Sequence, residues 1–386
     1  MTFARLALRD LGRNPLRLAL TVLAATVGVV AFIFLQTVID LWYAGVAGAQ
    51  ADRLIVRNKT GLTQELPLAY LQRIAAVPGV SAVSYAGWFG GALSEERSDF
   101  FPNVFVDSAT YLEVYDEYVA PEEEIAAWRA DPCGAMVGRK LADRFGWQVG
   151  DRVTLEGSIY PGTWDFTIRG IYEGRSPNVD TTVLAFGYRC LNERVEESQQ
   201  DYVGYFALRI DDPALSVQVA RSVDAMFANS PWETKTESER SFQLSFVAMS
   251  SAILSAVEIV SYVVLLIILL VVGNTLAMGV REKTRDLATL RALGFHRRHV
   301  LALVLLESLF IGLVAAALGT LLAPPLIENF AGIVQEQFGT LPEIRVRAGT
   351  VILAAAAALL VGLAAGALPA LRASRLAIAE GLREVA

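Results

Sequence analysis

The chain has 386 residues, of which 54% are hydrophobic and only 19% are charged, and its mean hydropathy is +0.43. These values are too apolar for an ordinary soluble enzyme and indicate a membrane protein. The net charge of −7 averages over compartments, so it carries no information about nucleic acid until the charges are sorted by segment.

The first segment, 1–17, predicts a basic amphipathic helix on the inner membrane surface. Arginines recur in it at intervals of four residues with leucines between them, and Pro15 is expected to turn the chain into the bilayer. The apolar run 18–40 is long enough for a first transmembrane helix. A cleaved signal peptide is the alternative, because residues 47–49 resemble a cleavage site, but the apolar run is longer than a usual signal sequence.

Residues 41–246 have the pattern of a mixed α+β domain, in which alternating segments predict strands and amphipathic segments predict helices. Strands are expected at 53–57, 82–88, 101–106, 163–172, 181–186 and 205–210. Helices are expected at 68–76, 122–130 and 214–228. Between them, 134–155 predicts a strand, a helix that Gly146 ends, and a second strand after a turn at Gly150 and Asp151.

Three more apolar runs complete the predicted fold class, an α-helical membrane protein with four transmembrane helices and a large α+β extracytoplasmic domain between the first and second. Pro324 and Pro325 are expected to end the third helix. The fourth is rich in Ala and Gly, which allows a neighbouring helix to approach closely. The expected segments are a stalk with the second helix at 247–280, a loop at 281–299, the third helix at 300–323, a short outer loop at 324–347, the fourth helix at 348–368 and a tail at 369–386.

Basic residues flank these helices unevenly. They are concentrated in 1–17, 281–299 and 369–386, whereas the remainder of the chain is acidic overall. By the positive-inside rule, both termini and the 281–299 loop are expected in the cytoplasm, with the large domain on the other side of the membrane.

The 281–299 loop combines charges of both signs at helical spacing with a stripe of leucines, and Gly294 is expected to end the helix. A short amphipathic helix between two membrane helices is suited to transmitting force from a soluble partner. The alternative is a solvated charged face that anchors to lipid headgroups. The residues predicted to contact a partner are Arg281, Glu282, Arg285, Asp286, Leu290, Arg291 and Gly294.

This segment resembles the cytoplasmic loop of FtsX-type ABC transporter permeases, the group of MacB-like, lipoprotein-export and cell-division proteins. The resemblance is carried by Arg281-Glu282-Lys283, Asp286-Leu287-Ala288, the run 290–294 and Glu307-Ser308, although the family's Glu-Ile-Gly is Asp-Leu-Ala here. The stretch 134–155 is similar to a recurring part of MacB-like extracytoplasmic domains. The tail 369–386 resembles the family's C-terminus, with Ala377-Ile378 in place of Asp-Pro.

The resemblance implies a non-catalytic permease subunit whose α+β domain has two subdomains. It implies a separate cytoplasmic ABC ATPase dimer that binds ATP and Mg²⁺, a second permease subunit that is identical or paralogous, surrounding membrane lipid, and a periplasmic adaptor or cargo protein. Export or extraction of lipoproteins or other hydrophobic cargo is the first interpretation. FtsX-like regulation of a cell-wall hydrolase or sensor, with no cargo moved, is the alternative.

A membrane-anchored enzyme is a third class, which the sequence disfavours. The chain has no phosphate-binding G-x-x-x-x-G-K-[ST] motif and no catalytic constellation. It is therefore expected to bind no ATP, no cofactor and no nucleic acid itself. With two cysteines and two histidines outside any metal-like spacing, no zinc site is expected.

Two side-chain pairings are considered from the residues. Cys133 and Cys190 both fall in the domain expected outside, where disulfides persist, so they form either a disulfide or two separately buried thiols. Glu307 lies well inside the third membrane helix, at the expected depth of Asn274 and Thr275 on the second, and is predicted to hydrogen-bond one of them. The alternatives are lipid headgroups or arginines of the N-terminal helix.

Overall fold

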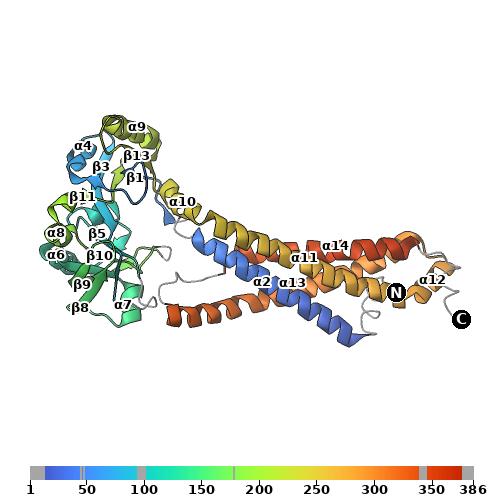
Figure 1. Cartoon of the computed structure of the whole chain (residues 1–386). Coiled ribbons are helices and arrows are strands. Elements are labelled where there is room, and N and C mark those ends of the chain that lie inside the picture. Colours follow the sequence, from blue (N-terminus) through green and yellow to red (C-terminus); the bar gives the residue numbers. More distant parts are fainter. Residues whose placement is uncertain are drawn as a thin grey trace. The chain divides into compact units, whose positions relative to one another are not determined.

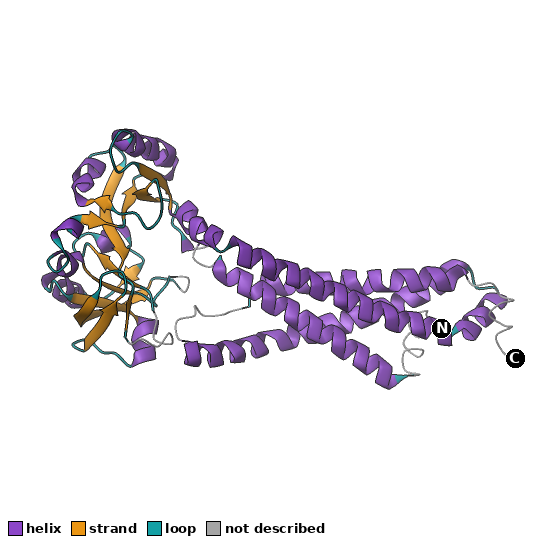
Figure 2. Cartoon of the chain, in the orientation of Figure 1, coloured by secondary structure: helices purple, strands orange, loops and turns teal. Residues whose placement is uncertain are grey.

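A computed structural model describes residues 14–43, 46, 48–93, 101–176, 179–338 and 346–375, with side chains omitted for 333–338. Most of the predicted helix 1–17 and the end of the predicted tail, 376–386, lie outside the described residues. The chain divides into a helical unit, made of 1–41, 251–332 and 343–386, and an α/β unit, made of 42–250 and 333–342. All strands of the described residues belong to the α/β unit (Figure 2).

Four helices within the described residues are long and apolar enough to cross a membrane (Figure 1). An apolar run in lipid must satisfy its backbone polar groups internally, and a continuous helix does so. The helices match the four that the sequence predicts, with somewhat longer bounds: α2 (Pro15–Trp42), α11 (Ser251–Glu282), α13 (Arg297–Phe338) and α14 (Ala348–Arg375).

The prediction that Pro324 and Pro325 end the third membrane helix is wrong, because α13 continues through both to Phe338. The predicted outer loop 324–347 is thus helical over its first part. The two prolines remove two backbone N–H donors, but the helix continues on both sides of them. In the same way α14 continues through Pro369, so the predicted tail begins as helix.

Small residues let α14 pack closely on its neighbours. A Cβ atom added to Gly362 of α14 would lie 3.1 Å from the Gly312 Cα atom of α13. A Cβ atom added to Gly273 of α11 would lie 3.4 Å from the carbonyl oxygen of Ala365. Side chains from all four long helices meet in one buried cluster, which includes Ala25, Ile268, Val272, Ile311 and Ala365. The helical unit is therefore one packed bundle.

The α/β unit is built on one connected mixed sheet, with strand order β13-β1-β12-β3-β5-β10-β7-β9-β8-β4 and with β6 paired to β9. The strands β5 and β10 pair in parallel, as do β7 and β9, and the other neighbours are antiparallel. The bounds are β1 (Arg53–Asn58), β3 (Val80–Trp88), β4 (Gly91–Ala92), β5 (Asn103–Val106), β6 (Tyr118–Val119), β7 (Gly134–Gly138), β8 (Arg152–Gly157), β9 (Gly162–Gly174), β10 (Leu184–Gly187), β12 (Tyr205–Ile210) and β13 (Thr234–Ser238). A separate pair is formed by β2 (Leu66–Pro67) and β11 (Tyr202–Val203).

Short helices connect these strands. The predicted helix 122–130 is α6, and Gly146 ends α7 in the left-handed conformation, φ +68°, that glycine adopts without strain. The helices of this unit are α4 (Leu71–Ala75), α5 (Tyr111–Val114), α6 (Glu122–Ala130), α7 (Arg139–Phe145), α8 (Tyr188–Asn192), α9 (Ser216–Phe227) and α10 (Glu239–Met249), with 3-10 turns η1 (Leu68–Tyr70), η3 (Glu197–Gln199) and η4 (Pro213–Leu215).

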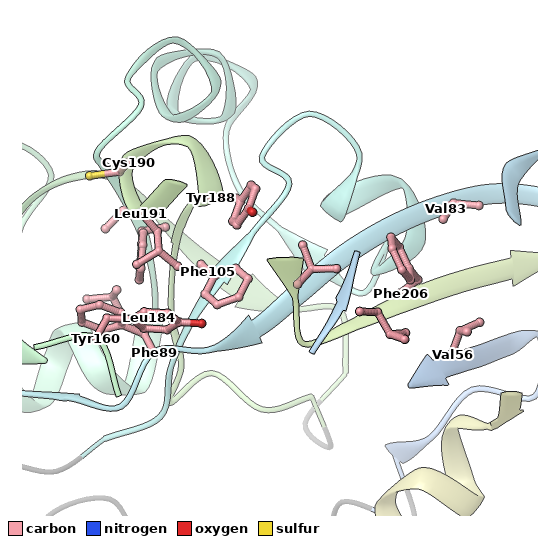
Figure 3. Packing of buried hydrophobic residues seen from close by; sticks show 14 of the residues in the cluster. Val56, Val83, Phe89, Phe105, Tyr160, Leu184, Tyr188, Cys190, Leu191 and Phe206 are labelled. Carbon is pink, nitrogen blue, oxygen red and sulfur yellow. The ribbon is translucent and has the colours of Figure 1, made fainter. Parts of the chain in front are cut away.

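Two apolar clusters cover the two faces of the sheet, because successive strand side chains point to opposite sides. On β1, Val56 belongs to the first cluster and Ile55 to the second. The first cluster is rich in aromatic rings, among them Phe89, Phe105 and Phe206 (Figure 3). The family resemblance implied two subdomains, and one continuous sheet runs through this unit.

The edge strand β13 is held by ion pairs. The Glu237 carboxylate lies 2.7 Å from Arg57 Nε on β1 and 2.8 Å from Lys235 Nζ. Burial opposes ionisation of Glu237, but the hydrogen bonds from Lys235 and Arg57 outweigh it and lower the pKa of this carboxyl below its usual value. The ion pairs therefore favour the paired strand at neutral pH.

The two cysteines form a disulfide. Cys133 immediately precedes β7, and Cys190 lies in α8, which follows β10, the neighbour of β7 in the sheet. Their Cα atoms are 4.9 Å apart. Of the two arrangements that the sequence left open, the structure has the disulfide.

Candidate coupling site

The segment 281–299 folds as the end of α11, a short helix α12 (Thr284–Ala292) and the beginning of α13. Lys283 separates α11 from α12. Beyond α12, Gly294 has φ +98°, a left-handed conformation that favours glycine. The sequence thus placed this helix and its end correctly, although both neighbouring membrane helices extend further into the predicted loop.

The apolar face of α12 is seated on the membrane helices. Leu287 and Ala288 are only 3% and 1% exposed. Leu287 packs in a cluster with Val300 and Leu303 of α13 and with Ala373 of α14, among other residues. A force applied to α12 would therefore reach α13 and α14 through close apolar contact.

Leu290 has a different position from the one expected. It was predicted to contact a partner, but it is half-buried against the same cluster. Leu287 and Leu290 are three residues apart and so share a helix face, and that face is turned toward the membrane helices.

Glu282 joins the end of α11 to the beginning of α2. Both of its carboxylate oxygens lie 2.7 Å from Arg17 Nη2, and Asn14 Nδ2 donates to one of them at 3.3 Å. The side chains of Arg17 and Glu282 are partly exposed, so this ion pair contributes modestly to stability. Glu282, predicted to contact a partner, thus already has partners within the chain.

Lys283 joins the other side of the site to α13. Its Nζ atom lies 3.0 Å from Glu307 Oε1, and the two side chains are 17% and 8% exposed. The predicted hydrogen bond of Glu307 to Asn274 or Thr275 is therefore wrong, and the Thr275 hydroxyl instead donates to the Val271 carbonyl of its own helix.

The reason is electrostatic, because a full positive charge compensates a carboxylate in an apolar setting better than an amide or a hydroxyl does. Lysine at a helix end can extend its long side chain along the neighbouring helices. A search for partners of Glu307 that included lysines and arginines near the helix ends, and not only residues at the same depth, would have identified Lys283 from the sequence.

The opposite side of α12 and the turn after it are exposed. Leu293 and Phe295 are 73% and 38% exposed although both are large and apolar. Of the predicted contact residues, Arg281, Arg285, Asp286 and Gly294 are exposed and Arg291 is half-buried. We call these five residues, together with Leu293 and Phe295, the coupling surface. Leu293 and Phe295 were not among the predicted contact residues, although two large apolar residues that flank a helix-ending glycine are a signal for such a surface.

The coupling surface has the chemistry of a protein-docking surface. A hollow of about 590 Å³ is lined by Phe295, Arg291 and the basic residues Arg297 and Arg298, with His296. Apolar side chains surrounded by arginines suit a partner with an apolar contact and acidic neighbours. Within the described residues, no group of three or more His, Cys, Asp or Glu could hold a metal ion.

Two family models match the chain. The FtsX-like permease C-terminal model matches residues 258–378, which include the coupling surface, and the MacB-like periplasmic core domain model matches residues 18–226. An uncharacterized ABC transporter permease protein of Mycobacterium tuberculosis is 24% identical over 222 residues, which are 55% of this chain and 24% of that protein. The chain thus spans about a quarter of the length of this curated relative.

Two solved structures are similar to about half of the chain. The periplasmic region of MacB from Actinobacillus actinomycetemcomitans aligns with a TM-score of 0.37 and 10% identity, covering 52% of this chain and 95% of that one. The extracellular domain of the ABC-type transporter YknZ from Gram-positive bacteria aligns with a TM-score of 0.36 and 8% identity, covering 48% and 98%.

Proposed function

The chain belongs to the ABC transporter permeases of the MacB/FtsX type, and we propose that it couples ATP hydrolysis by a separate cytoplasmic ATPase dimer to movement of its α/β domain. ATP and Mg²⁺ bind to that partner, and this chain performs no chemistry. The coupling surface and both termini face the cytoplasm, and the α/β domain lies outside the inner membrane.

The observation that carries this proposal is the two-sided character of α12. One side, with Leu287 and Ala288, is buried on the membrane helices, whereas Arg285 and Asp286 are exposed on the helix. The turn after α12 exposes Leu293 and Phe295. At the same place Glu282 is paired to α2 and Lys283 to α13. Movement imposed on the exposed side is therefore shared by all four membrane helices rather than absorbed by one.

The movement driven by ATP hydrolysis serves, in this proposal, to export or extract lipoproteins or other hydrophobic cargo. A match to the MacB-like periplasmic core domain over most of the α/β unit favours export over regulation of a cell-wall hydrolase. A second permease subunit completes the assembly, and side chains exposed on α2 and α11, such as Leu23 and Ile267, offer apolar surface to that subunit or to lipid.

The experiment is reconstitution of the permease with its ATPase in nanodiscs, comparing Leu293→Glu with Val149→Glu. Val149 is a matched control, because it is an exposed apolar residue of the α/β unit. A charge at position 293 should weaken ATPase association at least about tenfold, since it would have to be desolvated in the contact. Val149→Glu should leave association unchanged. Equal association of the two variants would overturn the proposal.

A further inference from the structure

The α/β domain contains a cavity of about 520 Å³ whose lining no step of ATPase coupling uses. Its volume is in the range of small-molecule sites. Strands β3, β5, β6 and β12, with α5 and the first turns of α10, contribute to its walls. Seven aromatic residues line it, among them Tyr111, Tyr115 and Tyr118.

The tyrosine rings form a continuous aromatic wall. Ring centroids are 4.6 Å apart for Tyr111 and Tyr115, and 5.8 Å apart for Tyr115 and Tyr118. Burial raises the pKa of Tyr111, Tyr115 and Tyr118 well above the usual value, so the phenols stay neutral. Neutral rings present the electron-rich faces that attract cations.

The cavity is also negatively charged. Three carboxylates line it, from Glu117, Asp180 and Glu239, and no lysine or arginine is among its described lining residues. Arg53 pairs with Glu117 at 2.6 Å and with Glu239 at 2.9 Å. One guanidinium therefore pairs with two of the three carboxylates.

The Glu239 carboxylate is buried and pairs with Arg53. Burial raises the pKa of its carboxyl above the usual value, although Arg53 and a hydrogen bond from the Gln50 backbone oppose the shift. A second cation in the cavity would favour the ionised form. Because Glu239 is the first residue of α10, which leads along the chain into α11, a ligand here would engage the segment that precedes a membrane helix.

One cation already lies on this wall. The Arg53 guanidinium carbon is 4.0 Å from the centroid of the Tyr115 ring. By contrast, a bare metal ion has no suitable ligand cluster in the described part of the chain. An anion would be repelled by the carboxylates.

We propose that this cavity binds an organic cation, namely an ammonium or guanidinium group carried on an apolar body, between the tyrosine wall and the three carboxylates. The site does not depend on the ATPase coupling proposed above, and it is tested by binding alone.

The probe is benzyltrimethylammonium, titrated by calorimetry into the full chain in nanodiscs of zwitterionic phosphatidylcholine, with empty nanodiscs as background. Its anionic counterpart is 3-phenylpropanoate. Saturable binding of the cation and none of the anion is expected. Absence of saturable cation binding, or equal binding of the anion, would overturn the assignment.

Variants locate the probe in the cavity. Tyr118→Leu removes a ring and should weaken binding roughly 3- to 30-fold, whereas Tyr118→Phe keeps the ring and should change it less than about threefold. Asp180→Asn removes one charge at an exposed position, so it should weaken binding without disturbing the core. Unchanged affinity in both Tyr118→Leu and Asp180→Asn would place the bound probe elsewhere and refute the site.

Discussion

The Lys283–Glu307 ion pair permits a prediction with a definite magnitude. Its side chains are 17% and 8% exposed, so removing one partner takes a close opposite charge away from a group that water reaches poorly. Lys283→Met should destabilise the helical unit by about 3 kcal/mol, the cost typical of breaking a buried pair, and Glu307→Leu by a similar amount. Combining the two should restore part of the loss, because the double variant removes both charges together.

Thermal or denaturant unfolding of the purified chain in nanodiscs measures this cycle, with the helical circular dichroism signal as the readout. The coupling free energy should be at least about 2 kcal/mol and favour the intact pair. Single variants that each cost less than about 0.5 kcal/mol and add without interaction would refute the account of Lys283 as the compensating charge of Glu307.

Three further predictions concern the rest of the fold. Replacing Cys133 and Cys190 by serine opens a loop of 57 residues and should lower the free energy of unfolding of the α/β domain by about 4 kcal/mol. Unfolding with and without reductant measures this loss, and an unchanged unfolding midpoint would contradict the prediction. Because the pKa of Glu237 is lowered by folding, its contribution is present above about pH 4.5 and is lost as pH falls through the folded value. Glu237→Gln should therefore be less stable than wild type at pH 7 and differ less at pH 3, which acid titration of unfolding would test. Gly362→Leu should lower the free energy of unfolding by about 1–3 kcal/mol, because the new side chain would collide with α13. Gly349→Leu is the control on the same helix, where no atom lies within 4 Å of an added Cβ, and it should have little effect. Equal effects of the two variants in thermal unfolding would argue against the close helix contact.

Helices and strands that are determined by neighbouring residues in the sequence were predictable. The helix at 122–130 and the strand at 205–210 have the bounds predicted for them, because charge placement in the first turn and regular alternation determine each without help from distant residues. The leucine stripe and Gly294 likewise identified α12.

Features that depend on distant partners were not predictable in this way. The strand β13 has the polar sequence TKTES and was missed, because its pairing depends on β1 and on the ion pair of Glu237 with Arg57. The continuation of α13 through Pro324 depends on surroundings that local propensity ignores. The partner of Glu307 lies 24 residues away on another element, so a comparison of helix depth alone selected the wrong residues.

The central claim is that the coupling surface on α12 and the turn after it receives force from a cytoplasmic ATPase. A photoreactive benzoylphenylalanine at position 293, in cells that express the chain with its native partners, tests this contact directly. Irradiation followed by mass spectrometry should yield a crosslink to a nucleotide-binding protein with a phosphate-binding loop, and the same label at the exposed control position 149 should not. Crosslinks from position 293 only to lipid, or to proteins of the periplasmic side, would contradict the account.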